Sequence, residues 1–263
     1  MRVLRSRHRR SAALILVAAS LHACSDSTGP DDGPPLTLSQ VMLEASDPLL
    51  TELASGVFMA PISLTSVSRF TAGGCNHDAA SQSFVCPTVS SGGLSFERSF
   101  VLFDAAGSRQ SQFSATTTAA VQMKMRVSGT MMSSNSRLTL EETDERTVSG
   151  LLTARHVLNG TSAMTMSGTF ATPGAKAEPI SMTSTTKTEN LVLPSRSNRW
   201  PGPGTMTTEA TSAFGTYIDS ELVTRMKVTF TGTKCATIAI SYENEVETYT
   251  IDLSNPNATS CRP

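Results

Sequence analysis

The stretch Val121-Gln122-Met123-Lys124-Met125-Arg126-Val127-Ser128 decides the fold class. Apolar and polar residues alternate along it, and successive side chains of a β-strand point to opposite faces. One face of the predicted strand is therefore apolar and the other is wet. This pattern is typical of an antiparallel sheet that has one face on a core and the other in solvent.

Alternating apolar residues predict further strands on both sides of this stretch. In chain order they cover residues 67–72, 83–89, 94–102, 109–115, 138–140, 148–158, 163–171, 179–193, 206–210, 214–230 (more than one strand), 238–242 and 249–253. The connections between them are short, so we predict an all-β antiparallel meander that forms a barrel or a strongly curved sheet.

Turn signals set the expected strand ends. Asp104-Ala105-Ala106-Gly107 predicts a turn, and the charged run 141–145 is expected to end the strand that begins at Leu138. Asn159-Gly160 is among the strongest hairpin signals and is expected to join strands 148–158 and 163–171. Strand 148–158 is apolar on both faces, which favours a central position in the sheet.

Residues 37–55 have a helical pattern. Thr37 and Gln40 have the spacing of a capping box, and Asp47-Pro48 can begin a second short helix. We expect a helix pair packed on the sheet, with strands from about residue 57. Residues 36–263 are thus predicted to be a single β-rich domain.

The first 24 residues have the layout of an export signal. Five arginines and no acidic residue occupy positions 1–10, and an apolar run follows at 12–21. This run is far shorter than the roughly 20 residues that a membrane-spanning helix needs. The leader ends with Leu21-His22-Ala23-Cys24.

These four residues resemble the lipobox of bacterial lipoprotein signals, in which Leu, two small residues and Cys follow one another. The resemblance implies cleavage after residue 23, a diacylglyceryl group on Cys24 and a place in the bacterial cell envelope. Ser25, directly after Cys24, favours sorting to the outer membrane. Residues 1–23 are then the signal peptide, and residues 24–35 are the lipidated cysteine with a flexible linker. An ordinary secretory signal and a twin-arginine signal at Arg9-Arg10 are the alternatives.

Four cysteines remain after the lipobox. An even number in an exported chain predicts two disulfides, and we favour Cys75 with Cys86 and Cys235 with Cys261 because each pair closes a predicted hairpin. A zinc site at Cys75, His77, Asp78 and Cys86 is the less favoured alternative.

Charge disfavours nucleic acid as a partner. Removal of residues 1–23 takes away five of the 21 basic residues and none of the 22 acidic ones, which leaves a net charge of −6. Binding to phosphates needs clustered Lys and Arg. No catalytic motif, cofactor site or metal site stands out, so we predict a protein that is not an enzyme.

Three other features suggest sites. The methionines at 123, 125, 164, 166, 182, 206 and 226 are expected to fill an aromatic-poor core, with copper(I) binding as the alternative. His156 is expected to be a core or rim residue. The loop with Arg196, Arg199 and Trp200 has the composition of a contact site.

The preferred functional hypothesis is a membrane-anchored lipoprotein that binds an apolar or lipid-like ligand in a barrel or half-barrel. Long strands with a Met, Val and Leu face and the resemblance to lipoprotein signals support it. The alternative is a structural or protein-contact lipoprotein of the cell surface, with the Trp200 loop as its contact.

Overall fold

The computed structural model describes residues 74–132, 136–171, 177–194, 198, 200–214, 222–242, 245–254 and 261. Within these ranges the chain forms strands and no helix. The expected signal peptide, Cys24, linker, helix pair at 37–55 and first strand at 67–72 lie outside the described residues.

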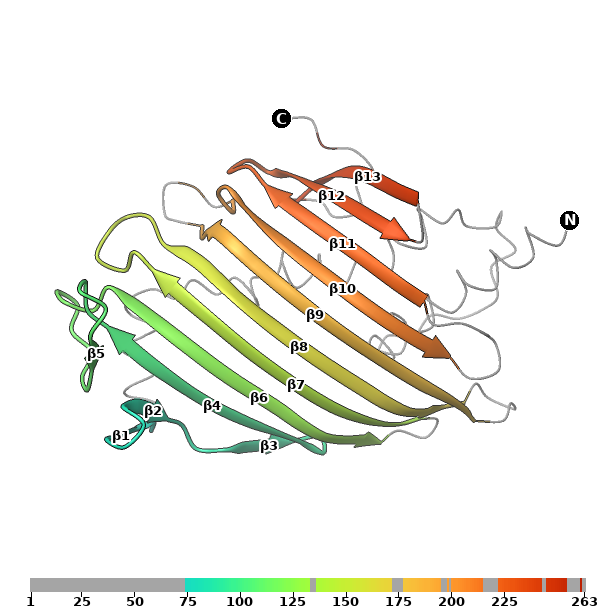
Figure 1. Ribbon diagram of the computed structural model, residues 1–263, viewed down its shortest axis with the longest axis horizontal. Coiled ribbons are helices and arrows are strands. Elements are labelled where there is room, and N and C mark those ends of the chain that lie inside the picture. The colour runs from blue at the N-terminus through green and yellow to red at the C-terminus, as the bar shows by residue number, and fades with distance from the viewer. Residues whose placement is uncertain are drawn as a thin grey trace, which may run out of the picture.

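The described residues form one 13-stranded antiparallel sheet (Figure 1). Its strands are β1 (Asn76–Asp78), β2 (Ser83–Val85), β3 (Val89–Ser91), β4 (Leu94–Phe103), β5 (Arg109–Gln110), β6 (Ala120–Met132), β7 (Ser136–Ser149), β8 (Val157–Phe170), β9 (Glu178–Val192), β10 (Gly204–Phe214), β11 (Leu222–Phe230), β12 (Cys235–Tyr242) and β13 (Glu245–Asp252). From β6 to β13 each strand pairs with the next one in the chain, as expected of a meander.

The sheet is open. Its order is β1-β2-β4-β6-β7-β8-β9-β10-β11-β12-β13, with β3 and β5 also paired to β4, and no pairing joins β1 to β13 among the described strands. The prediction of an all-β antiparallel meander is therefore confirmed, while a closed barrel is wrong. Figure 1 shows that the long strands lie side by side and that the sheet twists from β4 to β13.

The two faces of the sheet differ as the pattern of β6 predicts. Val121 and Val127 are buried on one face, which we call the inner face. Lys124 and Arg126 are exposed on the other, which we call the outer face. Residues that lie directly opposite each other on paired strands point to the same side of the sheet, so the register assigns the residues of the neighbouring strands to the inner or the outer face.

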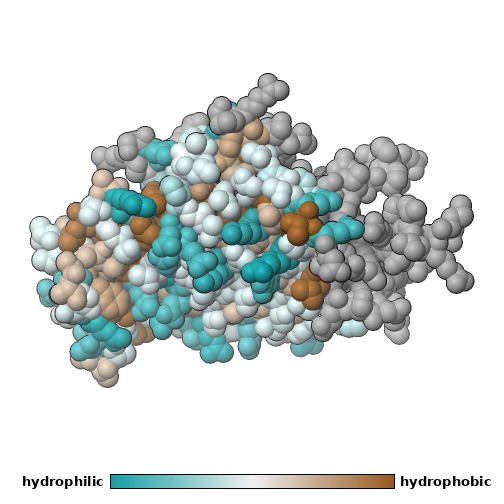
Figure 2. Space-filling view, turned by 45° about the horizontal axis from the view of Figure 1, so that its top comes forward, coloured by the Kyte–Doolittle hydropathy of each residue, from teal (hydrophilic) through white to brown (hydrophobic). Residues whose placement is uncertain are grey.

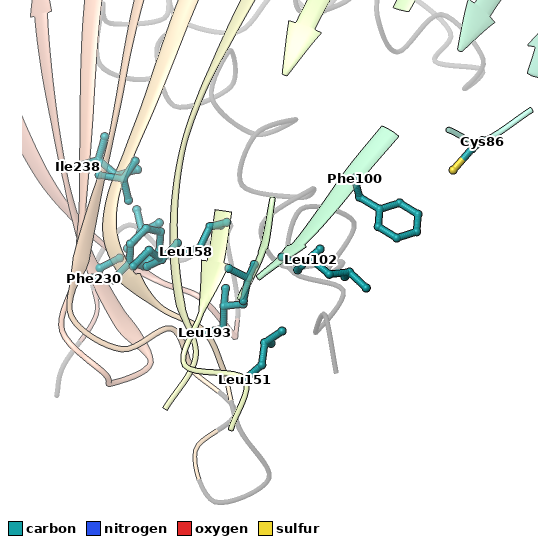
Figure 3. Close-up of a cluster of buried hydrophobic side chains, with 14 of the residues drawn as sticks. Cys86, Phe100, Leu102, Leu151, Leu158, Leu193, Phe230 and Ile238 are labelled. Atoms are coloured by element: carbon teal, nitrogen blue, oxygen red, sulfur yellow. The ribbon is translucent and has the colours of Figure 1, made fainter. Parts of the chain in front are cut away.

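Apolar side chains of the inner face form two clusters at opposite ends of the long strands. The larger cluster draws residues from β2, β4 and β6 through β13 and includes Leu102, Val148, Leu191 and Ile238, each at most 1% exposed. Figure 3 shows side chains from β4 and from the C-terminal strands on the same side of the sheet. The smaller cluster centres on Met166 at the other end.

The charged run 141–145 does not end a strand, and the expectation of a turn there is wrong. It lies in the middle of β7, which pairs without interruption with β6 and β8. Glu141 and Glu145 alternate outward into solvent, so the strand tolerates them. Asp144 points inward, where Arg146 binds its carboxylate.

Asn159-Gly160 does not form a hairpin either, because both residues lie inside β8. The Asn159 side chain oxygen accepts a hydrogen bond of 2.8 Å from the backbone N–H of Asn190, whose φ is +52°. A bulge lies there, with one residue of β8 opposite two of β9. A Cβ on residue 160 would come within 2.6 Å of the Glu145 carbonyl oxygen. Asn159 thus stabilises a β-bulge, and Gly160 allows β7 and β8 to approach closely.

The chain turns instead between β7 and β8, at residues 150–156. Gly150 has a φ of +79°, and its carbonyl accepts hydrogen bonds from the backbone N–H and hydroxyl of Thr153. The predicted central strand 148–158 is therefore wrong, and its apolar content reflects buried residues of the turn such as Leu151, which is 1% exposed. The strand expected at 109–115 is also shorter, since only β5 forms.

Other expectations are confirmed. The Asp104 carboxylate accepts hydrogen bonds from the N–H groups of Ala106 and Ser108 and closes the turn after β4. The β12–β13 hairpin pairs over its whole length. The two expected disulfides, Cys75–Cys86 and Cys235–Cys261, are both present.

Candidate functional site

An open groove of 1110 Å³ crosses the outer face of the sheet. Its lining residues come from β2, β4 and every strand from β6 to β11. We call it the transverse groove, because it runs across the strands. Figure 2 shows hydrophilic side chains gathered across the middle of the visible face of the sheet. The groove is open to solvent, and most of its lining residues carry hydroxyl or charged groups.

Threonines form the middle of the transverse groove. They stand on four neighbouring strands, at Thr143, Thr161, Thr185 and Thr207. Thr161 and Thr207 both lie opposite Lys187, and Thr143 and Thr185 both lie opposite Ala163, so the register brings them together. β-Branched residues favour strands, and each hydroxyl can donate and accept a hydrogen bond.

A first charged cluster lies at the β4–β7 end. Lys124 Nζ is 3.0 Å from a carboxylate oxygen of Glu145, and the Gln122 side chain N–H donates to the other oxygen at 2.7 Å. Arg126 and Glu97 also line this end, directly opposite each other on β6 and β4. Among the described residues neither makes an ion pair, so both charges face solvent.

A second charged cluster lies at the β9–β11 end. Lys187 pairs with Glu189 at 2.7 Å, and Arg225 pairs with Glu209 at 3.0 Å across β10 and β11. All four side chains are about half exposed. Such pairs add at most about 1 kcal/mol to stability. They mainly set the shape and charge of the groove.

The groove as a whole is electrically balanced. Its outer-face lining has four basic side chains and four acidic ones, which are Lys124, Arg126, Lys187 and Arg225, and Glu97, Glu145, Glu189 and Glu209. No aromatic residue and no histidine is among the described residues of its lining. The groove therefore offers hydroxyls and paired charges, and offers neither a stacking platform nor a side chain that titrates near neutral pH.

A buried ion pair lies on the inner face, behind the groove. Arg146 contacts Asp144 through two nitrogens, at 2.7 Å and 2.8 Å, and the two side chains are 19% and 8% exposed. Burial raises the pKa of Asp144 above its ordinary 3.8, and the Arg146 guanidinium opposes that shift. Gly160 leaves room for Arg146, because a Cβ there would lie 2.9 Å from Arg146 Cγ.

The methionines singled out in the sequence all lie on the inner face. Met123, Met206 and Met226 pack against the larger apolar cluster, and Met166 and Met182 belong to the smaller one. Their spread over both clusters favours the prediction that they fill a core.

Cys75 and Cys86, two of the four candidate metal ligands in the N-terminal hairpin, form a disulfide and so have no free thiol for a metal. His77 packs edge-on against the Phe84 ring, with centroids 5.1 Å apart. Asp78 accepts hydrogen bonds from the backbone N–H and hydroxyl of Ser81, which lower its pKa. The described residues hold no group of three or more His, Cys, Asp or Glu that would bind a metal.

The remaining described candidates, Trp200 and His156, do not line the groove. Trp200 is half-buried, and its backbone N–H donates to the Asn198 side chain. Arg196 and Arg199 lie outside the described residues. His156 lies in the turn before β8, where its carbonyl accepts from the N–H of Leu193. The structure does not bring Trp200 or His156 to the transverse groove.

The sequence contained only a partial signal for the groove. Thr185 and Thr207 lie on predicted strands, whereas Thr143 and Thr161 fall in segments predicted to turn. Only the register shows that these positions line up across the sheet.

Comparison with protein-family models, with curated proteins and with solved structures finds no match for this chain. A search of the described residues for a helix long and apolar enough to cross a membrane also finds none.

Proposed function

We propose that this chain is a membrane-anchored, non-enzymatic binding protein of the bacterial cell envelope and that the transverse groove holds an extended polar ligand. The observation that carries the proposal is the groove itself, which is lined by residues from eight of the described strands. Open grooves on rigid sheets suit binding, because strands hold side chains in fixed positions.

The groove has the features of a binding surface and lacks those of an active site. Its charged side chains are exposed, except that of Asp144, which points to the inner face and is paired with Arg146. Catalytic groups are usually found where burial and neighbouring charges shift pKa values toward their task. Binding without chemistry is the simpler reading of this arrangement.

The anchor is the second part of the proposal. It rests on the resemblance of residues 21–24 to a lipobox. We expect the chain to take up an alkyne-tagged fatty acid when it is made in a bacterial host, and Cys24→Ala to lose the label and leave the membrane fraction. Labelling of Cys24→Ala equal to that of the unmodified chain would refute the anchor.

A photo-crosslinking amino acid tests the groove while the ligand is unidentified. Placed at Thr161, on the floor, it should give a crosslinked adduct in intact cells. Placed at Thr250, exposed on β13 and away from the groove, it should give none. Adducts of equal yield at both positions, or at neither, would refute binding in the groove.

An apolar or lipid-like ligand on the inner face is the second candidate. The observation that favours it is the shared placement of the methionines there, since flexible thioethers adapt to varied apolar shapes. The helix pair expected at residues 37–55 would compete for the same face with its own apolar side chains. Native mass spectrometry of the full chain released from detergent tests this candidate, because a bound lipid adds mass that denaturation removes.

A further inference from the structure

We infer that the ligand of the transverse groove is an extended polypeptide segment that carries both acidic and basic side chains. This inference rests on the proposed function, because it names the chemical class that the groove would take. Four features of the groove support it: the balance of charges, the lack of stacking surfaces, the length, and two charges that are open to a ligand.

The charge balance disfavours ligands of one sign. The four basic and four acidic side chains that line the groove on the outer face lie in mixed clusters and cancel. Nucleic acids and polyanionic glycans gain affinity from clustered cations that displace counterions, and this groove has no such cluster. A chain with both signs gains attraction at each cluster and avoids repulsion.

The lining also disfavours ligands that bind by stacking. Bases of single-stranded nucleic acid bind on aromatic platforms, each worth about 1–3 kcal/mol. The described lining contains no aromatic residue. The threonines in its middle carry hydroxyls, which can match the N–H donors and C=O acceptors of a peptide backbone.

The length of the groove fits a peptide. It is lined by residues from eight strands. Neighbouring strands lie about 4.8 Å apart, so seven intervals span roughly 34 Å. An extended chain rises about 3.3 Å per residue, and about ten residues therefore fill the groove.

Two side chains are placed to read charges on that peptide. Arg126 and Glu97 face solvent at one end of the groove and make no ion pair among the described residues. Lys124 and Arg225, by contrast, already have carboxylate partners at 3.0 Å. An acidic peptide residue meets Arg126 and a basic one meets Glu97 without breaking an existing pair.

Fluorescence anisotropy with synthetic dodecapeptides on the full chain in detergent tests the inference. The probes are a peptide with equal numbers of Glu and Lys, an all-Glu version, an all-Lys version and chitohexaose as an uncharged glycan. We expect saturable binding of the balanced peptide and binding at least about tenfold weaker for the other three, because single-sign peptides meet repulsion at each cluster.

Charge reversal shows whether the peptide lies where we place it. Arg126→Glu should weaken the balanced peptide about fivefold, because it replaces an attraction with a repulsion. A peptide in which one Glu is changed to Lys should recover part of that loss. Lys227→Glu is the matched control, since Lys227 is exposed on the same face but does not line the groove, and it should change affinity less than about twofold.

Three results would overturn the inference. They are tighter binding of chitohexaose or a single-sign peptide, binding of the balanced peptide that survives Thr161→Trp, and no peptide binding at all. The photo-crosslink at Thr161 tests the proposed function separately from this inference. An adduct that resists proteases would leave the groove as a binding site and remove the polypeptide, whereas no adduct would remove the proposed function itself.

Discussion

Gly160→Ala tests how the β7 and β8 strands fit together. The added Cβ would lie 2.6 Å from the Glu145 carbonyl oxygen, 2.9 Å from Arg146 Cγ and 3.0 Å from Arg146 Cα. Ordinary carbon–oxygen contacts between strands are about 3.3–3.6 Å, so the backbones must part by roughly 0.7 Å. The neighbours are mostly backbone, which cannot rotate away.

The magnitude follows from two opposing effects. Overpacking costs about 1–3 kcal/mol, and we take about 2 kcal/mol for one methyl group against backbone. Replacing a strand glycine by alanine returns about 0.5–1 kcal/mol through lower entropy of the unfolded chain. The net loss in free energy of unfolding is therefore about 1–1.5 kcal/mol.

Urea unfolding of the full chain with its disulfides intact measures this loss, and a double-mutant cycle locates its origin. Arg146→Ala removes the Cγ that the new methyl group meets, so Gly160→Ala should cost at least about 0.5 kcal/mol less in that background. In the Lys227→Ala background, where no contact is shared, the cost should be additive within about 0.5 kcal/mol. A stabilising or neutral Gly160→Ala, or no coupling with Arg146, would refute the packing argument.

Three further outcomes follow from the fold. Leu102→Ala should lower the free energy of unfolding by about 3 kcal/mol, because the side chain is 0% exposed, whereas Leu152→Ala, in a residue 41% exposed, should cost less than about 1 kcal/mol. Cys86→Ser should cost about 2–3 kcal/mol under oxidising conditions and nothing extra once the chain is reduced, and an equal loss in both would count against the disulfide. Burial raises the pKa of the Asp144 carboxyl group above 3.8 despite Arg146, so the folded state binds a proton there more tightly than the unfolded chain does. Between pH 3.8 and the raised pKa, rising pH should therefore lower the free energy of unfolding of the unmodified chain relative to that of Asp144→Asn. Parallel pH profiles of the two proteins would contradict this.

The fold class could be predicted because strand periodicity is a local property. The alternation from Val121 to Ser128 gives the period, the burial and the exposed face of β6 correctly. The two disulfides could be predicted because each closes a neighbouring hairpin. These features depend on residues that are close in the chain.

The strand ends at β7 and β8 could not be predicted, because their causes are not local. Glu141 and Asp144 look like turn residues until the register assigns one to solvent and the other to Arg146. Asn159-Gly160 reads as a hairpin until a partner strand supplies the Asn190 bulge and the Glu145 carbonyl. In both places tertiary pairing overrides the turn propensity.

The transverse groove was missed for a related reason. Its threonines are ordinary strand residues when taken singly, and only cross-strand register puts Thr143, Thr161, Thr185 and Thr207 side by side. The loop of Trp200 drew attention by its composition alone. Composition shows that a residue suits contact, but register and curvature decide which residues share a surface.

The most direct test of the central claim is an NMR titration of the full chain, with labelled threonine methyl groups, by the balanced dodecapeptide. We predict that the methyl signals of Thr143, Thr161, Thr185 and Thr207 shift together and saturate, while that of Thr250 on β13 stays in place. Shifts confined to Thr250, or binding that leaves the four groove signals unmoved, would contradict the claim that the groove is the binding site.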